Sequence, residues 1–150
     1  MALTVKVNVE RLRYKLSQLV DDKVMLQVHN TFAKMCDPYV PMDEGYLSQS
    51  VHVTPQYVQY QGPYAHYMYM GEVYGPNIPI RDEDGLIIGW FSPPGQPKYP
   101  TGKAIQYNTE KHPLATKEWD KAMMRDKGDE FKLEVTRILR RKASEIDGRP

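Results

Sequence analysis

The side chains that could catalyse a reaction or bind a metal are few and scattered along this chain. The histidines are His29, His52, His66 and His112, and the single cysteine is Cys36. Because no His-x-x-x-His or Cys-x-x-Cys pair occurs, zinc has no ligand set at usable spacing. One cysteine cannot form an intramolecular disulfide, which fits a reducing compartment. Cys36 precedes Asp37, whose negative charge opposes thiolate formation, so we interpret it as a small apolar residue near a helix end.

Nucleophilic catalysis has little support in the sequence. A nucleophile needs a base within reach and a group that orients the base, and no serine lies in a G-x-S-x-G elbow. A small hydrolase that uses His66 or His112 with a nearby carboxylate is one hypothesis. A hydrogen-bonded, partly buried structural role is the simpler interpretation of His66. We therefore predict that the chain is not an enzyme and has no catalytic residues.

The acidic turn Asp82-Glu83-Asp84-Gly85 resembles part of a calcium-binding loop. The full loop needs an oxygen ligand two residues before Asp82 and a glutamate six residues after Gly85. Those positions hold Ile80 and Phe91. The glycines also do not precede a helix in the way a phosphate-binding loop requires. The sequence predicts neither a metal site nor a cofactor, and no small-molecule substrate.

The charge distribution argues against a dedicated nucleic-acid binder. The net charge is +1, whereas such proteins are usually strongly basic. The one basic cluster lies near the end of a predicted helix, where cations also complement the helix dipole. It consists of Arg137, Arg140, Arg141 and Lys142. A nucleic-acid-binding module that uses this cluster is the alternative hypothesis. The middle of the chain is acidic and would line a passage through which DNA slides without binding.

A long amphipathic helix is predicted for the first quarter of the chain, from Val9 to Cys36. Apolar residues recur there at steps of three and four, Asn8 can serve as the N-cap, and Pro38 prevents continuation. The preceding segment from Leu3 to Val7 alternates like a short strand. It lacks the continuous apolar core of a signal peptide, and no stretch of the chain is apolar enough to span a bilayer.

A second helical region is predicted from Pro113 to about Ile146. Proline suits the first position of a helix, and Gly128 should weaken or kink it. Trp119, Ala122 and Met123 form an inward-facing stripe on the first half. A second stripe continues along Phe131, Val135, Ile138, Leu139 and Ala143.

Short elements are predicted between the two helical regions. Asp43 can cap a turn of helix that carries Leu47 inward, and two alternating runs around Val51–Val53 and Val58–Tyr60 indicate an antiparallel pair. The segment from Tyr64 to Met70 should form a buried or interface-facing helical turn, ended by Gly71. If the segment faces an interface, the predicted contact residues are its tyrosines: Tyr64, Tyr67 and Tyr69.

The segment from Tyr74 to Gly102 is predicted to be a proline-stiffened arm. Ile78–Arg81 and Leu86–Phe91 flank Asp84-Gly85, which is a hairpin signal, and Ala104–Tyr107 is a further strand candidate. The hairpin is too apolar for a free loop, so it either folds back onto the core or packs on another chain. A projecting arm with an apolar tip favours packing on another chain. The predicted contact residues are Ile87, Ile88, Trp90 and Phe91.

This order of elements predicts an α+β fold with a long N-terminal helix and C-terminal helices packed on a small antiparallel sheet. The proline-rich β-hairpin arm would project from it. With 150 residues, the chain should form a single domain, 1–150, with the arm as an insertion at about 74–102.

Three stretches together resemble a known family of virus proteins. PMDEGYLSQS, from Pro41 to Ser50, is similar to a proline–x–aspartate–x–glycine–x–leucine–x–x–serine stretch of tailed-phage tail-completion proteins, often labelled minor capsid proteins. GPYAHYMYMGEVYG, from Gly62 to Gly75, is similar to that family's proline–tyrosine–alanine–x–tyrosine segment. HPLATKEWDKAM, from His112 to Met123, lies where the family has a proline-led helix. The resemblance covers nearly the whole chain.

The resemblance implies a virion protein of the phage neck, where the DNA-filled head joins the tail, assembled in the bacterial host cytoplasm. Such proteins form rings, here sixfold or twelvefold, contact other connector or tail proteins, and let DNA pass without specific binding. It implies structural roles for matching residues in the turn, the tyrosine segment and the later helix: Asp43, Gly45, Leu47, Ala65, Gly71 and Pro113. The arm departs from the shorter members of the family.

Overall fold

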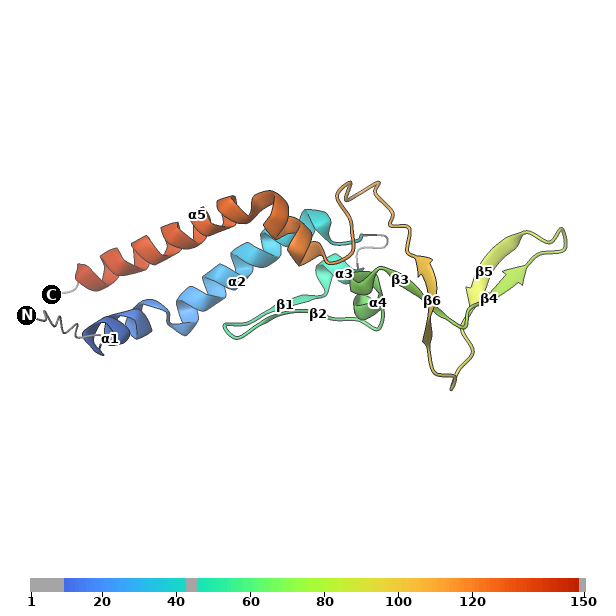
Figure 1. Ribbon diagram of the computed structural model, residues 1–150, viewed down its shortest axis with the longest axis horizontal. Helices are drawn as coiled ribbons and strands as arrows, with labels where there is room; N and C mark the ends of the chain where they lie inside the picture. Colours follow the sequence, from blue (N-terminus) through green and yellow to red (C-terminus); the bar gives the residue numbers. More distant parts are fainter. Residues whose placement is uncertain (1–9, 43–45, 149–150) are drawn as a thin grey trace, which may run out of the picture.

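The computed structural model describes residues 10–42 and 46–148, and the chain in it is elongated. At one end the first two helices follow each other along the chain and the last helix runs alongside them, and a β-hairpin projects at the other end (Figure 1). A small core and two further strand pairs lie between these ends. The chain is therefore mixed α and β, as predicted.

The first helical region consists of two helices, so the prediction of one continuous helix is wrong. α1 spans Glu10–Leu19 and α2 spans Asp22–Cys36. Asp21 is extended and its carboxylate accepts a hydrogen bond from the backbone N–H of Val24, so it caps α2 and interrupts the helical path. The predicted cap at Asn8 and strand from Leu3 to Val7 lie outside the described residues.

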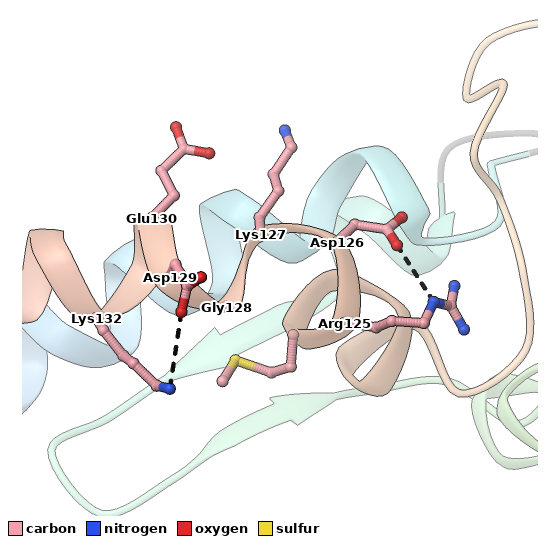
Figure 2. Close-up of a pocket in the computed structure, with 8 residues that line it drawn as sticks. Arg125, Asp126, Lys127, Gly128, Asp129, Glu130 and Lys132 are labelled. Atoms are coloured by element: carbon pink, nitrogen blue, oxygen red, sulfur yellow. Dashed lines mark hydrogen bonds and ion pairs between the residues drawn. The ribbon is translucent and has the colours of Figure 1, made fainter.

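The last helix, α5, spans Trp119–Asp147 and packs along α2. The prediction that this helix begins at Pro113 is wrong. Residues 113–118 form turns, and Glu118 has a left-handed backbone with φ +45°. The predicted weak point is real: Lys127, next to the buried Gly128, has non-helical angles of φ −131° and ψ 19°. A shallow pocket lies against this kink (Figure 2), lined largely by charged side chains such as the ion-paired Lys132 and Asp129.

The strands form three separate antiparallel pairs in the described part of the chain, where one small sheet was expected. β1, Val51–Val53, pairs with β2, Val58–Tyr60, as predicted. The other pairs are β3, Glu72–Gly75, with β6, Tyr99–Ala104, and β4, Ile78–Arg81, with β5, Ile87–Phe91. The strand predicted for Ala104–Tyr107 is thus misplaced: it ends at Ala104.

Short helices connect these parts. A 3-10 helix, η1, covers Asp37–Tyr39 after α2, and α3 covers Tyr46–Gln49, close to the predicted turn. α4 spans Ala65–Met70 and ends at Gly71. Gly71 has φ +74°, a left-handed conformation that lets the chain leave the helix and enter β3.

The core is small and lies where the end of α2, η1 and the start of α5 meet. Trp119 is its centre, with Tyr60 and Tyr69 packed edge-on against the indole at ring-centroid distances of 5.1 Å each. The largest fully buried side chains among the described residues are Met123, Val40 and Cys36. The predicted stripe on the first half of α5 therefore faces the interior. No helix within the described residues is both long and apolar enough to traverse a bilayer.

Candidate assembly interface

The β4–β5 hairpin is built by its own turn chemistry. One carboxylate oxygen of Asp82 accepts hydrogen bonds from the backbone N–H groups of Asp84 and Leu86, at 3.0 and 2.8 Å. Arg81 donates from Nη1 to the carbonyl of Gly85 at 2.7 Å, and Gly85 itself has φ +81°. The predicted Asp84-Gly85 turn is therefore present. These bonds connect the end of β4 to the start of β5.

Apolar side chains cover both faces of this hairpin and remain exposed. Neighbouring residues of a strand point to opposite faces, so an ordinary surface hairpin would carry apolar residues on one face only. Here nearly all of β5 is exposed, and Trp90 keeps 62% of its surface open to solvent. The exposed apolar residues are Ile78, Ile80, Leu86, Ile87, Ile88, Trp90 and Phe91. These seven residues are called the arm surface below.

The base of the arm is fastened by polar contacts. The ammonium group of Lys98 donates to the carbonyl of Pro76 at 3.3 Å, to Oδ1 of Asn77 at 3.1 Å, and to the hydroxyl of Ser92. Thr101 donates from its hydroxyl to the carbonyl of Val73 at 2.6 Å. These bonds link the two ends of the arm to each other and to the β3–β6 pair, so the hairpin projects in a defined direction.

The tyrosines of α4 differ in their surroundings. Tyr64 is 72% exposed and lies just before the helix. Tyr67 is half-buried, with its ring centroid 4.7 Å from that of Tyr74. Tyr64 is therefore free to contact another chain, and Tyr67 presents only part of its ring.

Tyr69, the third predicted contact residue, is partly buried and packs against the chain's own core. Its ring packs against Trp119 and its hydroxyl donates to Oδ1 of Asp120 at 2.9 Å. Burial and this hydrogen bond both raise the pKa of the Tyr69 hydroxyl. The side chain therefore joins α4 to α5.

The structure places four of the six predicted motif residues. Leu47 packs against the core, Ala65 is the first residue of α4, and Gly71 is buried at its end. Pro113 lies exposed in the turn before α5. Asp43 and Gly45 lie outside the described residues.

The surroundings of Cys36 and His66 differ in their exposure to solvent. Cys36 is fully buried as the last residue of α2, and burial together with the nearby carboxylate of Asp120 raises the pKa of its thiol to about 12. The thiol is thus protonated at neutral pH and shielded from solvent. His66 is exposed, not partly buried as expected, with only a ring contact to Tyr67 at a centroid distance of 5.8 Å.

The fold gathers three polar residues that the sequence did not connect. His112 donates from Nδ1 to the carbonyl of Val40 at 2.7 Å, because a carbonyl oxygen can only accept. Its Nε2 lies 3.8 Å from Oδ2 of Asp37, whose other oxygen accepts a hydrogen bond from the hydroxyl of Ser48. The carboxylate lies between serine and histidine, so the histidine is not placed to take the serine proton. The cluster fastens η1 to α3 and to the turn before α5.

The basic cluster near the end of α5 is partly engaged within the chain. Lys142 lies 2.8 Å from Oδ2 of Asp21, and Arg137 pairs with Glu134. Arg140 and Arg141 are exposed. No group of three or more potential metal-ligating side chains gathers anywhere in the ranges 10–42 and 46–148.

A projecting hairpin with exposed apolar residues on both faces, carried by a small helical body, is typical of a subunit that assembles with other chains. Comparison with protein families agrees with this class. Residues 3–138 match the model of the minor capsid protein family, and the chain belongs to that family. It is a structural component of a phage virion, and its family is a structural one. Neither the curated proteins nor the solved structures gave a match.

Proposed function

We propose that this protein joins head and tail in the neck of a tailed phage and completes the tail or its attachment site. It would act as a homo-oligomeric ring, sixfold or twelvefold, that also contacts other connector or tail proteins. Assembly would take place in the bacterial host cytoplasm. The minor capsid family supports a virion role, and the arm surface supports subunit contacts.

The arm surface is the observation that carries this proposal. An isolated two-stranded hairpin is marginally stable in water, and stable sheets usually have more strands or a packed face. Burying one large apolar side chain contributes about 1.5–3 kcal/mol. The seven exposed residues therefore give a strong driving force for docking against another surface. Because the hairpin is already ordered by its turn and base, less conformational entropy is lost on docking.

A ring also needs two unlike surfaces on each subunit. A cyclic assembly of more than two copies uses a heterologous contact, in which one face of a subunit meets a different face of its neighbour. A projecting arm and a receiving surface provide this asymmetry. The acidic character of residues 37–107, with seven acidic and three basic side chains, suits a passage through which DNA slides without adhering.

Deleting Pro79 to Pro97 tests the proposal. We expect the helical far-ultraviolet circular dichroism signal and the unfolding midpoint to remain, because α2 and α5 pack without the hairpin. We expect the deleted chain to be missing from purified particles when it complements a phage that lacks the gene, as measured by quantitative mass spectrometry. Leu133→Ser, which removes another exposed apolar side chain from α5, is the control and should be incorporated normally.

Two results would contradict the proposal. Normal incorporation of the deleted chain would show that the arm is not needed for assembly. Loss of the helical signal would show that the arm is part of the folding core.

A further inference from the structure

A hollow lies at the base of the arm, between β3, β6 and the start of the hairpin. It has a volume of about 690 Å³, and its walls are mostly apolar or aromatic, with Tyr64, Val73 and Trp90 among them. Lys98 and Lys103 also line it. This hollow is called the basal groove below. Its size is in the range of protein sites that hold a compact ligand or several side chains.

The basal groove carries positive charge without a carboxylate partner in the described part of the chain. Lys98 makes three hydrogen bonds, all to uncharged oxygens, and Lys103 has an exposed side chain with no ion pair among the described residues. The nearest acidic residue along the strands, Glu72, accepts a hydrogen bond from the backbone N–H of Gly102 at 2.8 Å. The groove therefore suits an occupant that is both apolar and negatively charged.

The tip of the arm has that chemistry. Asp82, Glu83 and Asp84 form its turn, and Leu86, which follows, is 66% exposed. Glu83 and Asp84 are exposed and form no ion pair among the described residues, whereas Asp82 is used to hold the turn. The tip thus offers two carboxylates beside an apolar side chain.

The tip cannot reach the groove of its own chain. A β-strand rises about 3.4 Å per residue, so the five residues of β5 hold the turn about 17 Å from the base. Figure 1 shows the hairpin pointing away from β3 and β6. Folding back would break the strand pairing between β4 and β5.

We propose that the basal groove receives the Asp82–Leu86 tip of a second copy of this chain, with Lys103 facing Glu83 or Asp84. This contact specifies how neighbouring copies would meet in the ring proposed above, and the inference rests on that proposed function. Each copy inserts its tip into one neighbour and receives a tip from the other. The contact is heterologous, so it repeats around a ring.

Charge exchange between the two surfaces tests the contact. Lys103→Glu and Glu83→Lys each replace attraction by repulsion, and neither side chain makes a hydrogen bond or ion pair that holds the fold among the described residues. Each variant alone should self-associate at least about tenfold more weakly than the wild type, which corresponds to about 1.4 kcal/mol. Sedimentation equilibrium over a range of protein concentrations measures this. Glu130→Lys, the same charge change on an exposed residue of α5, is the control and should behave as wild type.

An equal mixture of the two variants distinguishes this contact from a general charge effect. In the mixture, the tip with the Glu83→Lys exchange meets the groove with the Lys103→Glu exchange, so the two exchanged charges again face each other with opposite sign. The Lys103→Glu chain keeps the wild-type tip, and this tip meets the wild-type groove of the Glu83→Lys chain. Both kinds of contact are then favourable, so association should return to the wild-type level. The double variant K103E/E83K should also recover. Absence of recovery in both would overturn the proposed contact.

The remaining outcomes separate this inference from the proposed function. If both single variants associate normally while deletion of Pro79 to Pro97 abolishes association, the arm is used but the basal groove is not its receptor. If the deleted chain associates like wild type, both proposals fail. A wild-type chain that stays monomeric up to millimolar concentration would likewise contradict the contact between copies.

Discussion

Asp21 joins two helices, α2 and α5, through two contacts of one carboxylate. One oxygen accepts from the N–H of Val24 at 2.8 Å and so caps α2, and the other lies 2.8 Å from Nζ of Lys142 on α5. The Lys142 bond is the main cause that lowers the pKa of Asp21, and the Val24 bond acts in the same direction. The residue separates α1 from α2 and links α2 to α5.

Asp21→Asn should lower stability less than Asp21→Ala, because asparagine still caps the helix but cannot pair with Lys142. The pH dependence has a defined sign. A carboxyl whose pKa is lowered by folding contributes stability above its unfolded value, near 4, and loses it as pH falls through the lowered folded value. The difference in unfolding midpoint between wild type and Asp21→Asn should thus be constant near pH 7 and shrink below about pH 4. Thermal melts from pH 7 to pH 2 measure it, and a difference that grows in acid would contradict the assignment.

Titratable groups at the core have raised pKa values, in contrast to the lowered pKa of Asp21. Burial raises the pKa of the Cys36 thiol to about 12 and raises the pKa of the Tyr60 hydroxyl as well. Both groups stay neutral at physiological pH, so they act as packing residues around Trp119 and not as acids or nucleophiles.

At the scale of elements, the turn from α4 into β3 connects several otherwise separate parts. Gly71 is buried at this turn, and its carbonyl accepts from the N–H of Ile105 at 2.9 Å. Close by, the N–H of Glu118 donates to the carbonyl of Tyr69 at 2.9 Å. The end of α4 therefore links the base of the arm to the start of α5.

Gly71→Ala should be strongly destabilising. A Cβ there would lie 2.7 Å from Cβ of Lys117, and the backbone has φ +74°. Gly102→Ala is the matched control, because it has a similar φ of +75° but an open surrounding. The control should lose about 1–2 kcal/mol from the left-handed backbone alone, and Gly71→Ala should lose more because of the contact. Urea unfolding measures both, and equal losses would show that the Lys117 contact carries no cost.

At the scale of the whole molecule, the buried core and the exposed arm surface lie in different parts of the chain. The buried residues gather around Trp119 and Met123, whereas the seven exposed residues of the arm surface lie on the hairpin, away from this core (Figure 1). A chain organised in this way can fold by itself and still carry an apolar surface for docking.

This separation predicts that one substitution lowers stability and another weakens self-association. Met123→Ala should reduce the free energy of unfolding by about 2–5 kcal/mol, because Met123 is fully buried. Trp90→Ser should change it by less than about 0.5 kcal/mol, since exposed positions contribute little, yet should weaken self-association. Urea unfolding and sedimentation measure the two effects. A large loss of stability in Trp90→Ser would show that the hairpin is part of the core.

The sequence by itself determined the local features of this protein. The alternation of Val51–Val53 and Val58–Tyr60, the Asp84-Gly85 turn, and the Gly71 stop each depend on neighbouring residues, so they could be read directly. The inward stripe of Trp119, Ala122 and Met123 followed from helical spacing. The similarity of its motifs to tail-completion and minor capsid proteins also led to the correct family.

Features that depend on distant contacts were decided only by the tertiary structure. Apolar spacing continues across Val20 and Asp21, so it could not reveal a break that Asp21 and Lys142 stabilise together. The start of α5 at Trp119 depends on the hydrogen bond between Glu118 and Tyr69, which overrides the helix signal of Pro113. Contacts with Trp119 and Asp120 partly bury Tyr69, whereas the hairpin stays exposed. Side-chain type alone could not predict this difference, because both segments carry aromatic residues and only the packed fold shows which one the core contacts.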